Sequence, residues 1–195
     1  MTREQSLVPP RQALQRTCLI LIMGVAGSGK TTLAKEILRR IWAVYLDNDH
    51  IVDAFFPHTR MGSNYEKRRP YFYQALYRIV SENLAVSNSV ILDVPHMREV
   101  KDPKWRGLIQ RLVGKTKARL VVIRCHCSDS VLRSRLKSRG ESKDRWKLTH
   151  WKEFLTQQPS LAPIPFSHLE VDTERNLSAN VNAALRHILH SSTSA

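Results

Sequence analysis

The sequence has no apolar stretch long enough to cross a membrane. A transmembrane helix needs roughly 18 consecutive apolar residues, and every hydrophobic run in this 195-residue chain is shorter. Residues 1–16 carry charges and prolines but no apolar core, so they do not resemble a secretory signal. We therefore expect a cytoplasmic protein with a flexible N-terminal tail over residues 1–16.

Cysteine is also scarce. The chain has three, an odd number, at Cys18, Cys125 and Cys127. This count gives no disulfide framework and is typical of a protein in a reducing compartment. The run Cys-His-Cys at 125–127 could be read as part of a metal site, but no second Cys/His pair at zinc-site spacing accompanies it. We expect no zinc site.

Acidic residues are few: 17 Asp and Glu stand against 31 Lys and Arg, which gives a net charge of +14. The excess of basic residues is concentrated between residues 98 and 152. Such a charge indicates an anionic partner, either nucleic acid, phosphates or an acidic metabolite. A solvated basic surface that binds nothing is the alternative, and charge alone does not separate the two.

Short apolar segments alternate with longer amphipathic ones along the chain. The apolar segments are rich in Val, Ile and Leu and alternate only weakly, which is typical of strands buried on both faces of a parallel sheet. We expect strands over 18–23, 43–46, 89–94, 118–125 and 168–172. We expect helices over 30–41, 65–87, 105–113, 128–138, 144–157 and 177–189.

This alternation predicts a doubly wound α/β fold with helices on both faces of a parallel sheet. Residues 157–166 contain three prolines and are expected to form a loop. No repeat or domain boundary is visible, so residues 17–191 are expected to form a single domain. In such folds ligands bind beyond the carboxyl ends of the strands, so the site is expected just after the first four strands.

A phosphate-binding loop follows the first strand. Residues 24–31, Gly-Val-Ala-Gly-Ser-Gly-Lys-Thr, match the pattern G-x-x-x-x-G-K-[ST] in full. The glycines let backbone N–H groups point at phosphate oxygens, and the helix that begins near Lys30 directs its positive end at the same anion. Lys30 can reach the outer phosphates, and the Thr31 hydroxyl can ligate Mg²⁺. The position between a strand and a helix supports ATP and Mg²⁺ as cofactors over an incidental glycine-rich turn.

The stretch Met-Gly-Val-Ala-Gly-Ser-Gly-Lys-Thr-Thr at 23–32 resembles the phosphate loop of gluconate kinases and related small-molecule kinases. That group includes shikimate kinases, zeta-type toxin kinases and AAA_33-type ATP-binding proteins resembling polynucleotide kinases. The resemblance implies a P-loop NTPase fold with five parallel strands in the order 2-3-1-4-5 and an arginine-rich lid at about 136–148. It implies that ATP is bound by Gly24, Val25, Ala26, Gly27, Ser28, Gly29, Lys30, Thr31 and Thr32.

Two carboxylates, Asp47 and Asp49, end the second strand in the stretch Tyr-Leu-Asp-Asn-Asp-His. Taken alone, they could be a strand end followed by a helix cap. In an extended segment residues i and i+2 face the same way, so both acids would point toward the ATP site. The related kinases carry D-x-D at this point. The resemblance implies that Asp49 accepts a proton from, or orients, the acceptor hydroxyl, and that Asp47 helps to hold Mg²⁺.

Asp93 ends the third strand after a run of apolar residues, as a Walker B-like acid does. It is expected to bind Mg²⁺ directly or through water, and a turn-capping Asp is the alternative. His96 and Arg98 follow in the loop where a substrate would be met. They are candidate acceptor contacts, or else ordinary loop polarity.

The fourth strand leads into a basic segment in which Arg135 and Arg139 are four residues apart and share a helix face. By resemblance to the lid of these kinases, Arg135 is expected to contact ATP and Arg139 the reacting phosphates. An arginine delivered by a closing lid stabilises the charge that develops during transfer. Arg175 lies where the adenine loop of such kinases is found. A basic solvated helix is the alternative for the lid arginines.

The segment between Asp49 and the long helix departs from gluconate kinases. The motif D-R-x-P-W-L is replaced by Arg-Arg-Pro-Tyr-Phe-Tyr at 68–73, which puts gluconate itself in doubt as the acceptor. Arg60 and Arg69 make the segment basic, which favours an anionic acceptor. They are candidate substrate residues.

The sequence thus predicts a kinase that uses ATP and Mg²⁺ to phosphorylate a hydroxyl of a small metabolite, anionic or sugar-like. The catalytic candidates are Lys30, Asp49 and Arg139. The charge leaves open a kinase of a nucleic-acid 5′-hydroxyl or a nucleotide-sugar, although no nucleic-acid-binding module is visible. A third possibility is an ATP-binding regulator without phosphotransfer. Neither the acceptor nor the oligomeric state follows from the sequence.

Overall fold

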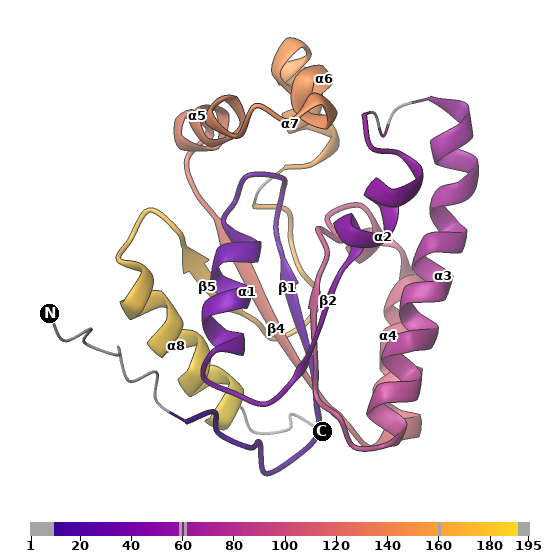
Figure 1. The fold of residues 1–195 in the computed structure, drawn as a ribbon, viewed down its shortest axis with the longest axis vertical. Helices are drawn as coiled ribbons and strands as arrows, with labels where there is room; N and C mark the ends of the chain where they lie inside the picture. Colours follow the sequence, from indigo (N-terminus) through magenta and orange to yellow (C-terminus); the bar gives the residue numbers. More distant parts are fainter. Residues whose placement is uncertain (1–9, 59, 61, 160, 191–195) are drawn as a thin grey trace, which may run out of the picture.

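The computed structural model describes residues 10–58, 60, 62–159 and 161–190. A five-stranded parallel sheet forms the centre of the described chain (Figure 1). The strands lie in the order β2-β3-β1-β4-β5. This confirms the expected α/β fold and its strand order. The strands are β1 (Cys18–Met23), β2 (Val44–Asp47), β3 (Val90–Asp93), β4 (Arg119–His126) and β5 (Leu169–Asp172).

Helices cover both faces of the sheet. In Figure 1, α1 (Lys30–Leu38) and α8 (Leu177–His190) lie on one side, and α3 (Ser63–Ala85) and α4 (Pro103–Thr116) on the other. All six residues of β1 are buried, and they alternate between the two faces. Leu19, Leu21 and Met23 pack with residues of α3 and α4, while Cys18, Ile20 and Ile22 pack with residues of α1 and α8. The near-continuous apolar strand is therefore explained by burial on both sides.

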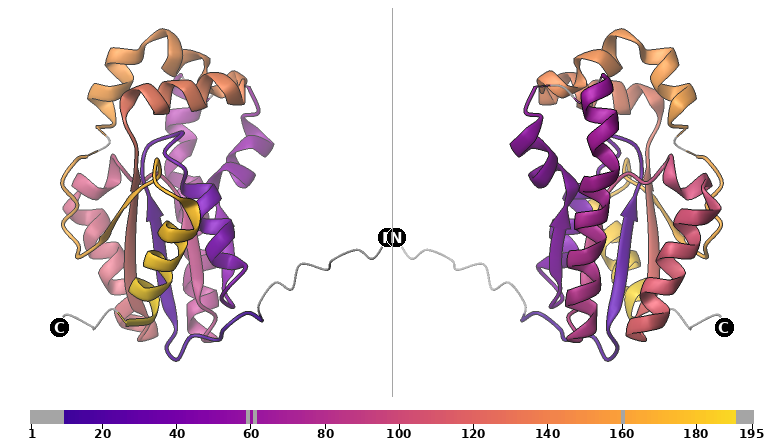
Figure 2. Two further views of the ribbon diagram at one scale, coloured as in Figure 1. Left: turned by 90° about the vertical axis from the view of Figure 1, so that its left-hand side faces the viewer. Right: turned by 90° about the vertical axis from the view of Figure 1, so that its right-hand side faces the viewer.

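A group of short helices lies above the carboxyl ends of the strands (Figure 2). It consists of α5 (Asp129–Arg139), η2 (Ser142–Asp144), α6 (Arg145–Thr149) and α7 (Trp151–Gln157), which we call the lid helices. Leu132, Leu136 and Phe154 form a small core beneath them with Val25 of the phosphate loop. This core fixes the lid helices directly over the loop.

The prediction of a single helix over residues 144–157 is wrong. The chain forms α6 and α7 instead, and His150 between them has φ −112° and ψ 48°, outside the helical region. The Thr149 hydroxyl donates to the Trp146 carbonyl at 3.0 Å. Local side-chain bonds of this kind compete with continuation of a helix.

Residues 1–9 of the expected N-terminal tail lie outside the described residues. Within the described part, Gln12 N donates to the Arg40 carbonyl at 2.7 Å, and Trp42 N donates to the Gln12 carbonyl at 3.0 Å. Leu14 packs against the core on the α1 side of the sheet. This part of the segment is therefore held against the fold. Across the described residues, no helix is long and apolar enough to cross a membrane.

Candidate active site

The phosphate loop connects β1 to α1 and has the tight backbone that its glycines allow. Gly24, Gly27 and Gly29 have φ values of 139°, 84° and 86°, in the region that favours glycine. A Cβ atom at Gly24 would lie 2.3 Å from the Cys125 carbonyl oxygen, so a side chain there would collide with backbone. The Lys30 ammonium donates to the Val25 carbonyl at 3.0 Å. The loop thus presents backbone N–H groups and a helix N-terminus at one point, which suits a phosphate.

Two carboxylates and two hydroxyls meet beside the loop. Thr31 Oγ1 donates to Asp93 Oδ2 at 2.6 Å. The Tyr45 hydroxyl lies 3.0 Å from Asp93 Oδ2 and 3.2 Å from Asp47 Oδ2. Asp47 and Asp93 are register partners at the ends of β2 and β3, which explains why they come together. Burial raises the pKa of Asp47, and the Asp93 charge raises it further.

This arrangement fits Mg²⁺. The ion takes hard oxygen ligands and is bound through one or two carboxylates together with phosphates and water. Thr31, Asp47 and Asp93 supply such donors next to the phosphate loop. Burial and the Asp93 charge raise the pKa of Asp47, and a divalent cation beside this carboxylate would favour its charged form.

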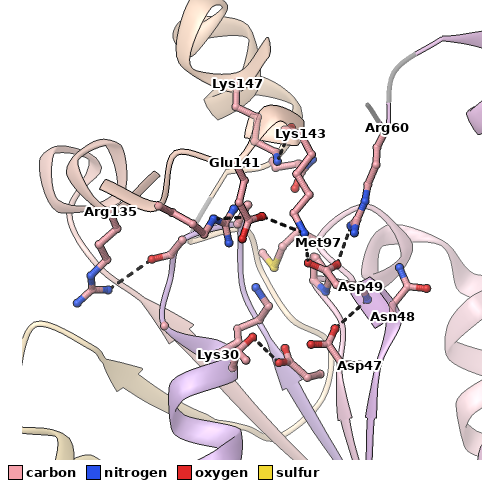
Figure 3. A pocket seen from close by; sticks show the side chains of 18 of the residues that line it. Lys30, Asp47, Asn48, Asp49, Arg60, Met97, Arg135, Glu141, Lys143 and Lys147 are labelled. Carbon is pink, nitrogen blue, oxygen red and sulfur yellow. Dashed lines mark hydrogen bonds and ion pairs between the residues drawn. The ribbon is translucent and has the colours of Figure 1, made fainter. Parts of the chain in front are cut away.

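The prediction of an extended segment through Asp47 and Asp49 is wrong. Residues Asn48–Phe55 form helix α2, which sequence reasoning missed. Asp47 is its N-cap, and its Oδ1 accepts from Asp49 N at 2.8 Å. The interpretation of Asp47 as a helix cap is therefore correct. Asp47 caps α2 and also lines the candidate site. Asp49 sits in the first turn of α2, and its carboxylate contacts Lys143 of the lid helices (Figure 3).

Asp49 belongs to a four-residue cluster of two acids and two bases. Arg60 donates to Asp49 Oδ1 at 2.6 Å, and a second nitrogen of Arg60 is in close contact with Asp53. Lys143, from the lid helices, lies 3.1 Å from Asp49 Oδ2 and 2.9 Å from Asp53 Oδ2. Asp49 and Asp53 are one helical turn apart, so each cation bridges both acids. Figure 3 shows Arg60 and Lys143 converging on Asp49.

The cluster fixes the charge of Asp49. Burial alone would raise the pKa of this carboxyl, but the Arg60 guanidinium and the Lys143 ammonium outweigh it and hold the pKa far below its ordinary value. The pKa of Asp53 is lowered by the same two cations, again against the effect of burial. A lowered pKa favours the carboxylate form of Asp49, which suits alignment of a hydroxyl more than removal of its proton.

A further ion pair, between Arg69 and Glu99, also lines the cavity. Arg69 of α3 is in close contact with Glu99, and its guanidinium lies 4.8 Å from the centre of the Tyr73 ring. His96 is completely buried and does not line the cavity. It packs against Trp105, with ring centres 5.0 Å apart. The structure therefore places Arg69 in the cavity wall and His96 beneath it.

Arg98 lies at the rim of the cavity. Its guanidinium donates to Gln157 Oε1 of α7 at 2.9 Å and lies 3.6 Å from Glu66 of α3. Arg98 therefore connects α7 of the lid helices to α3.

The two lid arginines point to different partners. Arg139 Nε donates at 2.8 Å to Asp144, whose side chain is completely buried, and Lys147 donates to the same carboxylate at 2.5 Å. Arg135 donates to the Thr173 hydroxyl and to the Thr173 carbonyl, both at 2.8 Å. Arg135 thus ties α5 to the end of β5, beside the phosphate loop.

A cavity of about 890 Å³ runs between these groups. Its walls include Ala26, Gly27, Gly29, Lys30, Thr31 and Thr32 at one end. Arg135, Arg139 and Arg175 also line it, as do Asp47, Asp49, Arg60, Arg69, Asp93 and Arg98. The predicted residues from distant parts of the sequence therefore meet in one space, and its size is that of a ligand site. Gly24, Val25 and Ser28 lie behind the wall that the loop forms, and His96 lies beneath the floor.

Sequence reasoning did not identify Asp53, Glu99, Lys143 or Lys147, which also line the cavity. Asp53 could have been found from its spacing of four residues after Asp49, had α2 been recognised as a helix. Lys143 carries no local signal, because only the fold of the lid helices brings it to α2.

The chain matches known proteins in sequence family and in fold. The family model described as AAA domain (AAA_33) matches residues 19–164. Comparison with curated protein sequences gave no match.

Several solved structures share the fold. A sugar kinase from Janibacter sp. HTCC2649 is similar over 88% of this chain and 94% of its own, with 18% identity and a TM-score of 0.65. A gluconokinase from Sinorhizobium meliloti 1021 is similar over 88% and 91%, with 19% identity and a TM-score of 0.56. Kti12 from Chaetomium thermophilum, in complex with ADP-AlF3, is similar over 89% and 100%, with 16% identity and a TM-score of 0.61.

Proposed function

Because this chain belongs to the AAA domain family AAA_33, and because its phosphate loop and Asp49 face one cavity, we propose that it is a kinase. It transfers the γ-phosphoryl group of ATP to a hydroxyl group of a small, sugar-like metabolite. The observation that carries this proposal is the position of Asp49. Its carboxylate lines the same cavity as the phosphate loop and is held by Arg60 and Lys143, where an acceptor hydroxyl would meet the triphosphate.

The nucleotide half of the cavity is formed by the phosphate loop, Arg135 and Arg175. Lys30 binds the outer phosphates, and Thr31, Asp47 and Asp93 hold Mg²⁺, which neutralises charge on the phosphates when it is bound. These roles accord with the donors that each residue presents.

The acceptor half is formed by α2, α3 and the lid helices. Asp49 aligns the acceptor hydroxyl for in-line attack, and its low pKa means that orientation is its main contribution. Arg139 lines the cavity from the lid helices, where it is held by Asp144. Residues 17–191 act as one domain in which residues 136–148 cover the reacting groups. A cytoplasmic location accords with three free cysteines.

A kinase of a nucleic-acid 5′-hydroxyl is the second candidate, and the net charge of +14 favours it. A nucleotide-sugar acceptor belongs to the same alternative. Binding of a nucleic acid would weaken steeply as salt concentration rises, with a slope set by the number of phosphates contacted. A small-molecule kinase would show a shallow dependence.

The test is a transfer assay with γ-labelled ATP and Mg²⁺ against sugars, sugar acids, nucleosides, antibiotics and 5′-hydroxyl oligonucleotides. Phosphate transfer to a small compound supports the proposal. Transfer to oligonucleotides alone supports the second candidate. Nucleotide binding with no transfer to any acceptor, and no effect of Asp49→Asn on binding or turnover, would identify a nucleotide-binding regulator instead.

A further inference from the structure

The cations that line the cavity fall into two groups. At the nucleotide end, Lys30 and Arg135 form no ion pair with a carboxylate of the described residues: Lys30 donates to a backbone carbonyl, and Arg135 donates to Thr173 and lies 3.5 Å from the Gly27 carbonyl. Their positive charge is available to an incoming triphosphate. Arg175, more exposed at this end, is 3.4 Å from Asp172.

At the acceptor end, every cation that lines the cavity is already paired with a carboxylate of this chain. These pairs are Arg60 with Asp49 and Asp53, Arg69 with Glu99, Arg98 with Glu66, Lys143 with Asp49, Asp53 and Glu141, and Arg139 and Lys147 with Asp144. Among the described residues, the acceptor end therefore offers balanced pairs of charges and no unpaired cation.

An anionic acceptor would have to displace one of these carboxylates. The side chains of Glu99 and Asp144 are only 15% and 0% exposed, so displacing either one would leave a buried charge without its partner. Removing one partner from a buried ion pair is strongly unfavourable. The positive charges of the segment around Arg60 and Arg69 are therefore neutralised in the folded protein by acids from other parts of the chain.

A neutral polyhydroxyl compound has no such requirement. Each carboxylate oxygen has two lone pairs, and each oxygen of Asp49 and of Asp53 has one cation partner here. Each can therefore accept a further hydrogen bond from a hydroxyl while the ion pairs stay intact. Two acids one helical turn apart can thus engage two hydroxyls of one molecule.

Apolar and aromatic groups complete the acceptor end. Tyr65, Tyr73, Met97, Trp146 and Phe154 line the same cavity. Met97 is labelled in the cavity wall in Figure 3, where Asp49, Arg60 and Lys143 converge. Flat apolar surfaces beside a few fixed polar groups suit a ring or chain that carries both C–H and O–H groups.

We propose that the acceptor is a neutral sugar or polyol, held by the Asp49–Asp53–Arg60–Lys143 cluster, and that the paired cations discriminate against sugar acids. This inference rests on the kinase function proposed above. The basic composition of this segment favours an anionic acceptor, whereas the ion pairs in the structure favour a neutral one.

The test uses pairs of compounds that differ in one carboxylate: sorbitol and gluconate, ribitol and ribonate, glucose and glucuronate. Phosphate transfer from γ-labelled ATP is measured for both members of each pair with the full chain. We expect kcat/KM for the better neutral substrates to exceed that of the matched acids at least tenfold. A preference for the acids overturns this inference and leaves the kinase function standing. Transfer to no member of any pair, but to another compound of the wider screen, overturns this inference alone. Transfer to no compound at all, with nucleotide still bound, overturns both.

Two variants test the cause of the selectivity. Glu99→Gln leaves Arg69 without a carboxylate, and Glu66→Gln does the same for Arg98. Either should raise kcat/KM for the acids about tenfold and reduce the preference for neutral compounds. Glu82→Gln is the matched control, because Glu82 pairs with Arg78 on the solvent-exposed side of the same helix α3. Unchanged selectivity in both variants would overturn the proposed role of the paired cations.

Discussion

Lys143 and Asp49 are 94 residues apart in the sequence, and the ammonium of one lies 3.1 Å from the carboxylate of the other. The contact joins the lid helices to helix α2 at the acceptor end of the cavity. Burial lowers the pKa of Lys143, but the Asp53 and Asp49 carboxylates raise it above its ordinary value, so the contact is between two full charges. It positions the one carboxylate that we expect to align the acceptor.

Lys143→Met should reduce kcat/KM for the acceptor about tenfold. Hydrogen bonds to charged groups contribute about 1.5–3 kcal/mol, and the lower end applies because the Asp49 side chain is 37% exposed. The Michaelis constant for ATP should change little. Lys152→Met, at an exposed position on α7, is the control for loss of one positive charge. A drop in ATP affinity equal to the drop in acceptor turnover would contradict the assignment.

Arg135→Ala should weaken nucleotide binding by about tenfold and leave the acceptor Michaelis constant within about twofold. Arg135 links α5 to Thr173 and the phosphate loop, so its loss affects the nucleotide end alone. Titration with a non-hydrolysable ATP analogue measures the change. Lys137→Ala removes a charge from an exposed position of the same helix and should bind the analogue normally. Equal weakening in both variants would mean that only the overall charge matters.

Asp93→Asn should raise the Mg²⁺ concentration needed for nucleotide-dependent stabilisation about tenfold or more. Asp93 accepts the Thr31 hydrogen bond and stands opposite Asp47, so its charge is central to the proposed metal site. The measurement is the rise in Tm with Mg²⁺ in the presence of ADP. Tyr45→Phe removes a hydrogen bond to Asp93 but no charge, and should keep most of the response. A normal Mg²⁺ response in Asp93→Asn would exclude this site.

His96 should make the folded state less stable as pH falls. Burial, with Arg69 and Lys30 nearby, lowers the pKa of His96 from 6.5 to about 3. The unfolded chain therefore binds one more proton than the folded chain between these two values. The free energy of unfolding should fall by up to about 1.4 kcal/mol per unit as pH drops below 6.5.

Chemical denaturation between pH 7 and pH 4.5 measures this slope. His96→Asn should reduce it, and Asn also tolerates the φ of 53° at this position. His58→Asn, at an exposed position, is the control and should leave the slope unchanged. A slope that His96→Asn does not alter would assign the pH dependence to other groups.

The fold and the nucleotide end of the cavity could be predicted from the sequence because their signals are local. A buried strand, a glycine-rich loop and a helix follow one another within residues 18–38, and apolar strands alternate with helices along the rest of the chain. The acid at the end of each strand is placed by the sheet itself, which is why Asp47 and Asp93 could be paired with the loop.

The acceptor end could not be predicted in the same way. Its wall is formed by ion pairs between segments far apart in sequence, such as Arg69 with Glu99 and Lys143 with Asp53. Composition shows a basic segment, but it does not show which carboxylates the fold brings to it. Helix α2 was missed because Asp47 and Asp49 resemble the polar end of a strand as much as the start of a helix.

The central claim is that Asp49 acts on the acceptor and not on the nucleotide. The most direct measurement compares wild-type protein with Asp49→Asn for transfer of labelled γ-phosphate to the acceptor identified by the screen, together with the affinity of each for an ATP analogue. The account predicts that kcat falls at least about a hundredfold while nucleotide affinity stays within about twofold. Unchanged kcat, or an equal loss of nucleotide affinity, would contradict it.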